Sequence, residues 1–279
     1  MKRIIFLFLL VTALLFVLGS CSIERKMARE FLQIKDSISI LLLPPDFVFK
    51  SNLNTWRIAS YDKISGELQQ QARIDSSRVL LEIEDTLVLS RYLGALQAGL
   101  RKYGIHVYTS DQIAGFLDVG RHAYQVHLAQ LEVEEGIYPF RAEEVFFDSI
   151  LYYEDFDLDK ISLNSWFEIS KLNDTQAESN VVYATNFVSD ELEGRFTSNV
   201  FNGEIKFIYN LTPLTIEDIY TLAATSGERY AAYIFDFVMN QYIYLNFPDD
   251  KKPDAYLNYD QQRKLLIPAA DRRFLFLDE

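Results

Sequence analysis

The first 21 residues constrain this chain most, because they divide it into a leader and a body that folds. Lys2 and Arg3 form a basic start, and Ile4–Leu18 is an apolar run interrupted only by Thr12. This layout is typical of a secretory signal that is removed after export. The run is shorter than the roughly 20 apolar residues that a membrane-spanning helix needs, although an uncleaved anchor is the alternative. We therefore expect residues 1–20 to be a signal peptide.

The apolar run ends in the sequence Leu18-Gly19-Ser20-Cys21. These residues resemble the lipobox of bacterial lipoproteins, in which a leucine and two small residues precede a cysteine. The resemblance implies cleavage between Ser20 and Cys21, a diacylglyceryl group on the Cys21 sulfur, and palmitate-type acylation of the new amino terminus. Each buried CH₂ contributes about 0.8 kcal/mol, so two or three acyl chains hold a protein on a bilayer. Ser22 in place of Asp resembles an outer-membrane address, and we expect the body to face the periplasm.

The charge of the body excludes several kinds of partner. The chain has 27 Lys and Arg against 40 Asp and Glu, a formal net charge of −13. Loss of Lys2 and Arg3 with the leader leaves 25 cations against 40 acids, or −15. Such a body is repelled by phosphate backbones, so we expect no nucleic-acid partner. Anionic lipid head groups do not attract it either, so its membrane contact must come from the anchor on Cys21, the single cysteine.

Hydrophobic periodicity predicts an α+β fold: one mixed, largely antiparallel sheet with packed helices and a helical carboxyl-terminal region. The expected units are a lipidated tether (21–36), a mixed domain (37–247) and a mostly irregular tail (248–279). Within the tether, Ile23–Ile34 is either a short helix or a polar connection, and within the tail, Phe274–Leu277 is expected to dock back as a small strand. Strands are expected at Ser37–Leu43, Ile105–Tyr108, Ile161–Ile169 and Val181–Val188. Helices are expected at Asp85–Tyr103 and at Thr109–Leu117, where the second begins with a capping box. Two further helices are expected at Ile216–Ala224 and Glu228–Phe247, with a bend at Ser226-Gly227 between them.

Two details of strand pairing follow from the same patterns. Apolar residues alternate over Tyr124–Leu128 and resume in the opposite phase over Ala129–Val133, which predicts a β-bulge near Leu128. Asn202-Gly203 predicts a hairpin. With a two-residue turn, Phe196 pairs with Tyr209 on an apolar face.

Residues that could carry chemistry are few. The histidines His106, His122 and His127 lack second ligands at metal-site spacing. Asp155, Asp157 and Asp159 have the alternate-acid spacing of a calcium loop, but the loop glycine and distal glutamate are missing, so we expect a solvated acidic loop. Nucleophile motifs and glycine-rich phosphate loops are absent. We therefore assign no catalytic residue, metal or cofactor.

The aromatic segment Tyr230–Phe247 is the most unusual part of the body. Three residues at seven-residue spacing are expected to face the core: Tyr230, Phe237 and Tyr244. Three others lie at different angles around the helix, where the rest of the domain or a partner must cover them: Tyr233, Phe235 and Tyr242. We consider these three a possible partner surface, against the more ordinary alternative of a buried helix.

The order of elements resembles periplasmic lipoproteins of the transport-auxiliary and penicillin-binding-protein-activator type. The residues that carry this likeness are Ile40–Pro45, the helix ending at Gly104, Ile105–Tyr108 and Tyr124–Val133. It implies a non-enzymatic accessory or scaffold of an envelope assembly or transport machine, with a protein partner whose identity the sequence leaves open. The alternatives are an envelope-polymer hydrolase with paired carboxylates and a carrier of lipid or another small ligand.

We predict that Cys21→Ser abolishes incorporation of a fatty-acid analogue in cells, because the thiol is the proposed attachment atom. Metabolic labelling followed by purification measures this, and Ser22→Ala, which leaves the thiol intact, serves as the matched control. Equal labelling of wild type and Cys21→Ser would contradict the anchor.

Overall fold

The computed structural model describes residues 22–58, 61–63, 65–120, 122–172, 179–199, 201–248, 252–269 and 273–277. The predicted signal peptide and the predicted lipid attachment site at Cys21 lie outside these residues. Within the described ranges, every helix is too short or too polar to cross a membrane.

The α+β class predicted from the sequence is confirmed. The helices are α2 (Ile23–Ile34), α3 (Gly66–Asp75), α4 (Asp85–Lys102), α5 (Ile113–Leu117) and α6 (Ile216–Leu245). The strands are β1 (Ser39–Leu43), β2 (Phe49–Asn52), β3 (His106–Tyr108), β4 (Ala123–Phe146), β5 (Ser149–Lys171), β6 (Asn180–Ser189), β7 (Glu191–Ser198), β8 (Ile205–Thr212), β9 (Tyr256–Asp260), β10 (Leu265–Ala269) and β11 (Leu275–Phe276). Single 3₁₀ turns lie at Lys35–Ser37, Thr55–Arg57, Tyr61–Lys63, Leu80–Glu82 and Ser110–Gln112.

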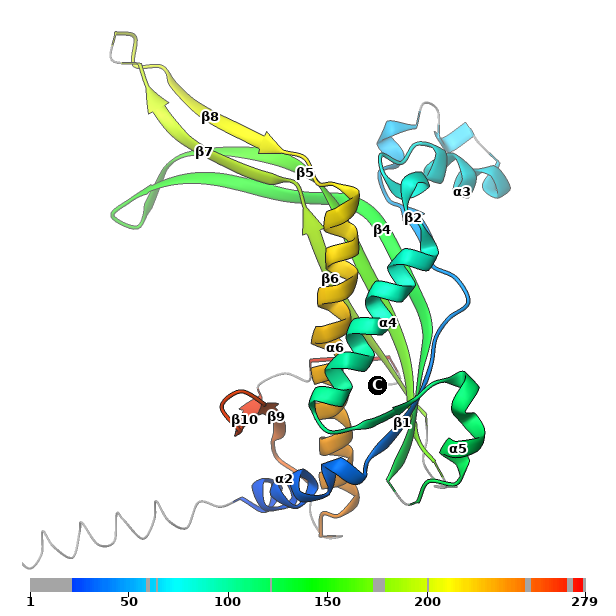
Figure 1. The fold of residues 1–279 in the computed structure, drawn as a ribbon. Coiled ribbons are helices and arrows are strands. Elements are labelled where there is room, and N and C mark those ends of the chain that lie inside the picture. The colour runs from blue at the N-terminus through cyan, green and yellow to red at the C-terminus, as the bar shows by residue number, and fades with distance from the viewer. Residues whose placement is uncertain are drawn as a thin grey trace, which may run out of the picture.

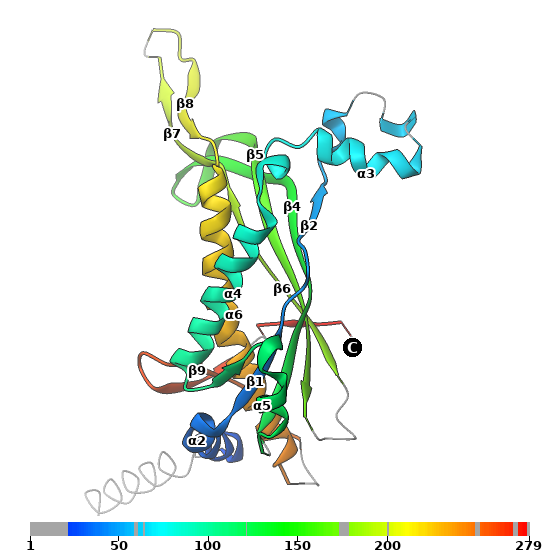
Figure 2. The ribbon, with the colours of Figure 1, turned by 45° about the vertical axis from the view of Figure 1, so that its right-hand side comes forward.

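The main sheet is mixed and has the strand order β11-β6-β5-β4-β1-β3, with β2 alongside β4. β1 runs parallel to both β3 and β4, whereas β4, β5 and β6 are antiparallel neighbours. The predicted bulge is confirmed, since the β4–β5 register shifts between Leu128 and Gln130. The shift keeps Leu131 and Val133 on the same buried face as Leu128, under α4 and α6 (Figures 1 and 2).

The carboxyl-terminal helix differs from the prediction of two helices bent at Ser226-Gly227. α6 is one helix of 30 residues, and Thr215 and Asp218 form a capping box at its start. Gly227 does not break the helix; it lies where α6 crosses α4. A Cβ atom there would come within 2.2 Å of the backbone oxygen of Tyr92. The glycine is therefore explained by the close approach of two helices, a tertiary constraint that local sequence does not reveal.

The segment after Cys21, for which a short helix and a polar tether are the expected alternatives, forms helix α2, which packs on α6. Ser22 caps its first turn by accepting a hydrogen bond from the Arg25 N–H, at 3.4 Å. Phe31 is buried, with its ring centroid 5.5 Å from that of Phe235 and 5.6 Å from that of Tyr242. The chain thus becomes part of the folded body at Ser22, one residue after the proposed anchor.

The carboxyl-terminal segment forms the β9–β10 hairpin where an irregular tail was expected, and the small strand expected at Phe274–Leu277 is confirmed as β11, which pairs with β6. A buried carboxylate on α6 holds it in place. Asp236, 1% exposed, accepts the Tyr259 N–H at 2.9 Å and pairs with the Arg273 guanidinium at 2.9 Å. Phe274 is buried beside Phe167 and Tyr233. Asp236, the β6–β11 pairing and Phe274 therefore attach the end of the chain to the core together.

Burial raises the pKa of Asp236 to about 7, although Arg273 and the Tyr259 N–H both act to lower it. In the unfolded chain this carboxyl ionises near its ordinary value of 3.8. The folded protein therefore binds a proton that the unfolded chain has lost when the pH lies between about 4 and about 7. Because a raised pKa favours the protonated folded form, this contribution to stability is fully present below the unfolded pKa. It is lost as the pH rises through that window.

We predict that the free energy of unfolding falls by on the order of a few kcal/mol between pH values of about 4 and about 7 because of Asp236, and that Asp236→Asn removes this part of the decline. Urea unfolding at several pH values measures it, and Asp254→Asn, an exposed acid in the same segment, is the control. Identical pH profiles for wild type and Asp236→Asn would refute the assignment.

Candidate functional site formed by two stacked hairpin arms

Strands β4 and β5 extend well past the sheet that they help to build. The β5–β6 pairing ends at Lys160 opposite Ser189, and the β2–β4 pairing ends at Asn52 opposite Glu135. Beyond these points β4 and β5 continue as a two-stranded hairpin, which we call the first arm (137–158). The β7–β8 hairpin forms the second arm (191–212). Both arms project from the end of the molecule opposite α2 (Figure 1).

The two arms contact each other through aromatic side chains. Phe156 of the first arm lies 5.4 Å from the ring of Phe207 and 5.0 Å from that of Tyr209 in the second arm. Tyr152 and Phe196 make a further contact at 6.2 Å. The inner faces are therefore apolar and partly cover each other, while the outer face of the first arm carries Asp155, Asp157 and their neighbours.

The register of the second arm differs from the prediction by two residues. Phe196 pairs with Phe207 and not with Tyr209, because the connection is longer than a two-residue turn. The Asn199 side chain accepts the Phe201 N–H at 2.9 Å, and the Asn199 N–H donates to the Glu204 carbonyl at 2.8 Å. A shift of two residues keeps every side chain on its predicted face, so the apolar face is as expected.

The arm tips expose large apolar side chains. Phe147 is 87% exposed and Phe201 is fully exposed. The other exposed apolar residues of the arms are Tyr138, Val145, Phe146, Ile150, Leu151, Tyr152, Tyr153, Ile208, Tyr209 and Leu211. Soluble proteins rarely expose contiguous apolar patches of this kind unless they bind something. The arms are therefore the candidate interaction surface of this protein.

The turn at the tip of the first arm supports this interpretation. Val145 pairs with Ile150 and Phe146 with Ser149, which leaves Phe147-Asp148 as a two-residue turn. Both turn residues have positive φ, 45° and 62°, a conformation that favours glycine or asparagine over phenylalanine. A bulky residue in this conformation costs on the order of 1 kcal/mol. An exposed Phe147 there is explained better by binding than by folding.

The acidic segment that resembles a calcium loop belongs to the first arm, and the prediction of a solvated loop is wrong. Asp155, Asp157 and Asp159 alternate with Phe156 and Leu158, which is the period-two pattern of a strand. That alternation was the sequence signal for the arm. Among the described residues, no cluster of His, Cys, Asp or Glu could hold a metal ion.

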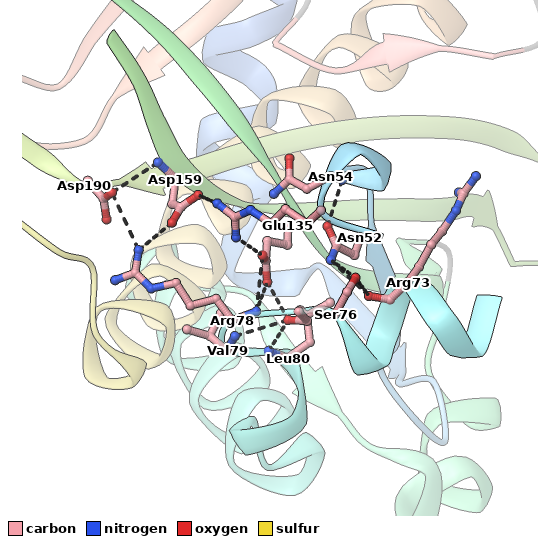
Figure 3. Close-up of polar contacts among 12 residues, drawn as sticks. Asn52, Asn54, Arg73, Ser76, Arg78, Val79, Leu80, Glu135, Asp159 and Asp190 are labelled. Carbon is pink, nitrogen blue, oxygen red and sulfur yellow. Dashed lines mark hydrogen bonds and ion pairs between the residues drawn. The ribbon is translucent and has the colours of Figure 1, made fainter. Parts of the chain in front are cut away.

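A buried ionic network fixes the first arm at its base (Figure 3). Glu135 of β4 is 1% exposed and lies 3.3 Å from the Arg57 guanidinium. Its carboxylate also accepts the backbone N–H of Arg78 at 3.1 Å and the Ser77 hydroxyl. Arg57 and Arg78 come from the connection between β2 and α4, and both pair with Asp159 of β5. The network therefore joins this connection to both strands of the first arm.

The same network reaches the second arm through Asp190, the residue between β6 and β7. Asp190 accepts the Asp159 N–H at 3.2 Å and the Leu214 N–H at 2.8 Å, and it lies 3.8 Å from Arg78. One carboxylate thus connects β5, the start of the second arm and the segment that leads into α6. The two arms are held at a common base.

Three residues of α6 were predicted as a possible partner surface, and the structure buries one of them and half-buries the other two. Phe235 is fully buried, because Phe31 of α2 and Tyr103 pack on it. Tyr233 and Tyr242 are half-buried against the same core. Tyr230 and Phe237 face the core as expected, but Tyr244 is exposed. The aromatic residues of α6 mostly pack within the monomer. Exposed aromatic residues are concentrated on the arms, and a few others lie on the body: Phe47, Phe49, Trp56, Phe187 and Tyr244.

Two further features bear on the alternative functions, which are a hydrolase with paired carboxylates and a carrier of lipid or another small ligand. Glu132 and Glu134 share one face of β4, and the pKa of Glu134 is raised by burial and by its neighbour Glu132. They alternate with Leu131 and Val133, which lie in the core, so they lie on the opposite face of the sheet. A hollow of about 360 Å³ lies near the start of α2, lined by Ile23, Glu24, Phe247, Lys252 and Asp254. Three of these five residues are charged, so this hollow differs from the apolar cavity that a lipid carrier needs.

Comparison with known proteins gives little to add. No family model matches the chain, and no curated protein matches it. One similar solved structure is a homolog of neuraminyllactose-binding hemagglutinin from Helicobacter pylori, with 11% sequence identity and a TM-score of 0.29. That match covers 76% of this chain and 90% of the other. A TM-score this low supports no inference about fold or function.

We predict that Glu135→Gln lowers the free energy of unfolding by about 2–3 kcal/mol, because it removes the buried negative charge that pairs with Arg57 and one of the two oxygens that accept hydrogen bonds from Ser77 and Arg78. Glu143→Gln, at an exposed position on the same strand, should change it by less than about 0.5 kcal/mol. Urea unfolding measures both. Equal effects of the two substitutions would show that the network does not stabilise the base of the arms.

Proposed function

We propose that this chain is a membrane-tethered, non-catalytic adaptor lipoprotein that binds a protein partner through its arms. The observation that carries the proposal is the separation of two ends. Helix α2, which begins two residues after Cys21, lies at one end, and the aromatic arms lie at the other (Figures 1 and 2). A lipid on Cys21 would place the arms away from the bilayer.

The chemistry of the arms favours a protein over a lipid surface or a nucleic acid. Residues 137–158 contain six acids against one arginine, a net charge of −5. Anionic membranes and phosphate backbones are repelled by such a surface. Aromatic side chains are enriched at the cores of protein–protein interfaces, and the rims of such interfaces are polar.

The stacked arms and the ionic network at their base also support a binding role. Partners that are already ordered lose less conformational entropy on association. The contacts between Phe156 and Phe207 and between Asp159 and Asp190 order both arms before any partner arrives. We place this adaptor in the bacterial envelope, on the periplasm-facing side of the outer membrane, as an accessory or scaffold of an assembly or transport machine.

We predict that a photo-crosslinking amino acid in place of Phe147 or Phe201 yields the same covalent adduct in the cells that produce the protein. Tyr244, exposed on the other end of α6, is the matched control position and should yield no such adduct. Mass spectrometry of the purified adducts identifies the partner. Absence of an adduct from both arm positions, or an identical adduct from Tyr244, would refute the proposed function.

A further inference from the structure

The first arm has a free backbone edge along β5. From Ser149 to Leu158 this strand pairs only with β4, because the β6 pairing stops at Lys160. Free strand edges are templates for the addition of another strand, and many peptide-binding proteins use them in this way. The inference that follows rests on the function proposed above and specifies how the partner binds.

The direction of the backbone groups on this edge follows from the bonds of Asp159. Its N–H donates to the Asp190 side chain at 3.2 Å, and its carbonyl accepts the Asp190 N–H at 2.9 Å, so both groups point away from β4. In an antiparallel pair, alternate residues point the same way. The N–H and C=O groups of Tyr153, Asp155 and Asp157 therefore face the free edge, and no described residue pairs with them there.

The opposite edge of the first arm is less suited to strand addition. Pro139 of β4 lies opposite Asp157 and has no N–H to donate. Proline within sheets is found where the missing N–H faces away from the neighbouring strand. The outer edge of β4 is thereby interrupted at Pro139, whereas residues 149–158 contain no proline.

The two faces beside the free edge differ in chemistry. On the outer face, Asp155 pairs with Arg141 at 2.6 Å, and Asp157 has no ion pair among the described residues. On the inner face, Tyr152 and Phe156 lie against the aromatic side chains of the second arm. A strand added to this edge would meet acids on one face and aromatic rings on the other.

We propose that the first arm binds an extended segment of its partner as an additional strand on the 149–158 edge of β5, and that this segment alternates basic and apolar residues. The basic side chains lie on the outer face beside Asp157, and the apolar side chains lie on the inner face beside Phe156. Charge distinguishes this edge from those of the second arm, where three acids face two cations over residues 191–212.

The test uses the full chain in a nonionic detergent and three capped synthetic peptides with fluorescent labels. In one peptide lysine and valine alternate; in another glutamate replaces lysine; in the third the lysines and valines are grouped in two blocks. Fluorescence anisotropy should show binding of the alternating lysine peptide at least about tenfold tighter than of either other peptide. Its affinity should fall as the salt concentration rises.

Matched substitutions at one position separate strand addition from general attraction. Tyr153→Pro removes an edge-facing N–H and should weaken binding about tenfold, whereas Tyr153→Ala keeps that N–H and should weaken it much less. Asp157→Asn should weaken binding and reduce its salt dependence. Hydrogen exchange on the wild-type protein needs no variant, and the peptide should protect the amides of Tyr153, Asp155 and Asp157.

The outcomes are distinguishable. Protection of these three amides with a selective loss in Tyr153→Pro supports the proposal. Equal binding of the alternating and the block peptide, or binding without amide protection, overturns it in favour of simple charge attraction. If the cross-links from Phe147 and Phe201 form while the peptide fails to bind, the adaptor function stands and strand addition fails. Absence of both overturns the two proposals together.

Discussion

The arms depend on one arrangement of charge at their base. Asp159 lies between Arg57 and Arg78, and Asp190 joins Asp159 to the segment that leads into α6. Carboxylates this buried are costly unless they are paired, and here each is satisfied by guanidinium or backbone N–H groups. This arrangement acts together with apolar contacts at the base of the arms, where Leu158 and Leu214 are buried and Tyr138 lies 5.5 Å from Phe187.

The apolar packing of the body complements this network. α6 crosses α4 at Gly227, where the backbone of one helix touches that of the other, and both helices cover the same face of the sheet. α2 and the carboxyl-terminal segment then cover further aromatic side chains of α6, although Tyr244 stays exposed. The body therefore covers most of its aromatic residues, while the arms present many of theirs to solvent and to each other. This contrast makes the arms the surface most suited to binding.

The open edge of β5 would ordinarily favour uncontrolled association. The acids of the first arm counter it, because a second copy would bring like charges together. A basic partner segment would meet no such repulsion. In the proposed strand addition, the acids of the first arm therefore disfavour self-association and favour a segment of complementary charge.

Local sequence determined the features that depend on neighbouring residues: the α+β class, the capping box at Thr109, the bulge after Leu128 and the existence of the hairpin at Asn202-Gly203. The leader and the lipid site at Cys21 remain predictions from the same local pattern. The alternating acids were also the sequence signal for the first arm. Acids at every second position, however, fit a metal-binding loop as well as a projecting strand.

Only the tertiary structure decided which aromatic residues are covered and which are exposed. Phe235 is buried because Phe31, which is distant in the sequence, packs on it. Gly227 is required because α6 crosses α4 there, with the backbone of Tyr92 directly opposite. The partners of Glu135 likewise come from a separate connection, with Arg57 lying 78 residues away in the chain. Periodicity reports the conformation of a segment, whereas burial depends on which distant segment arrives to cover it.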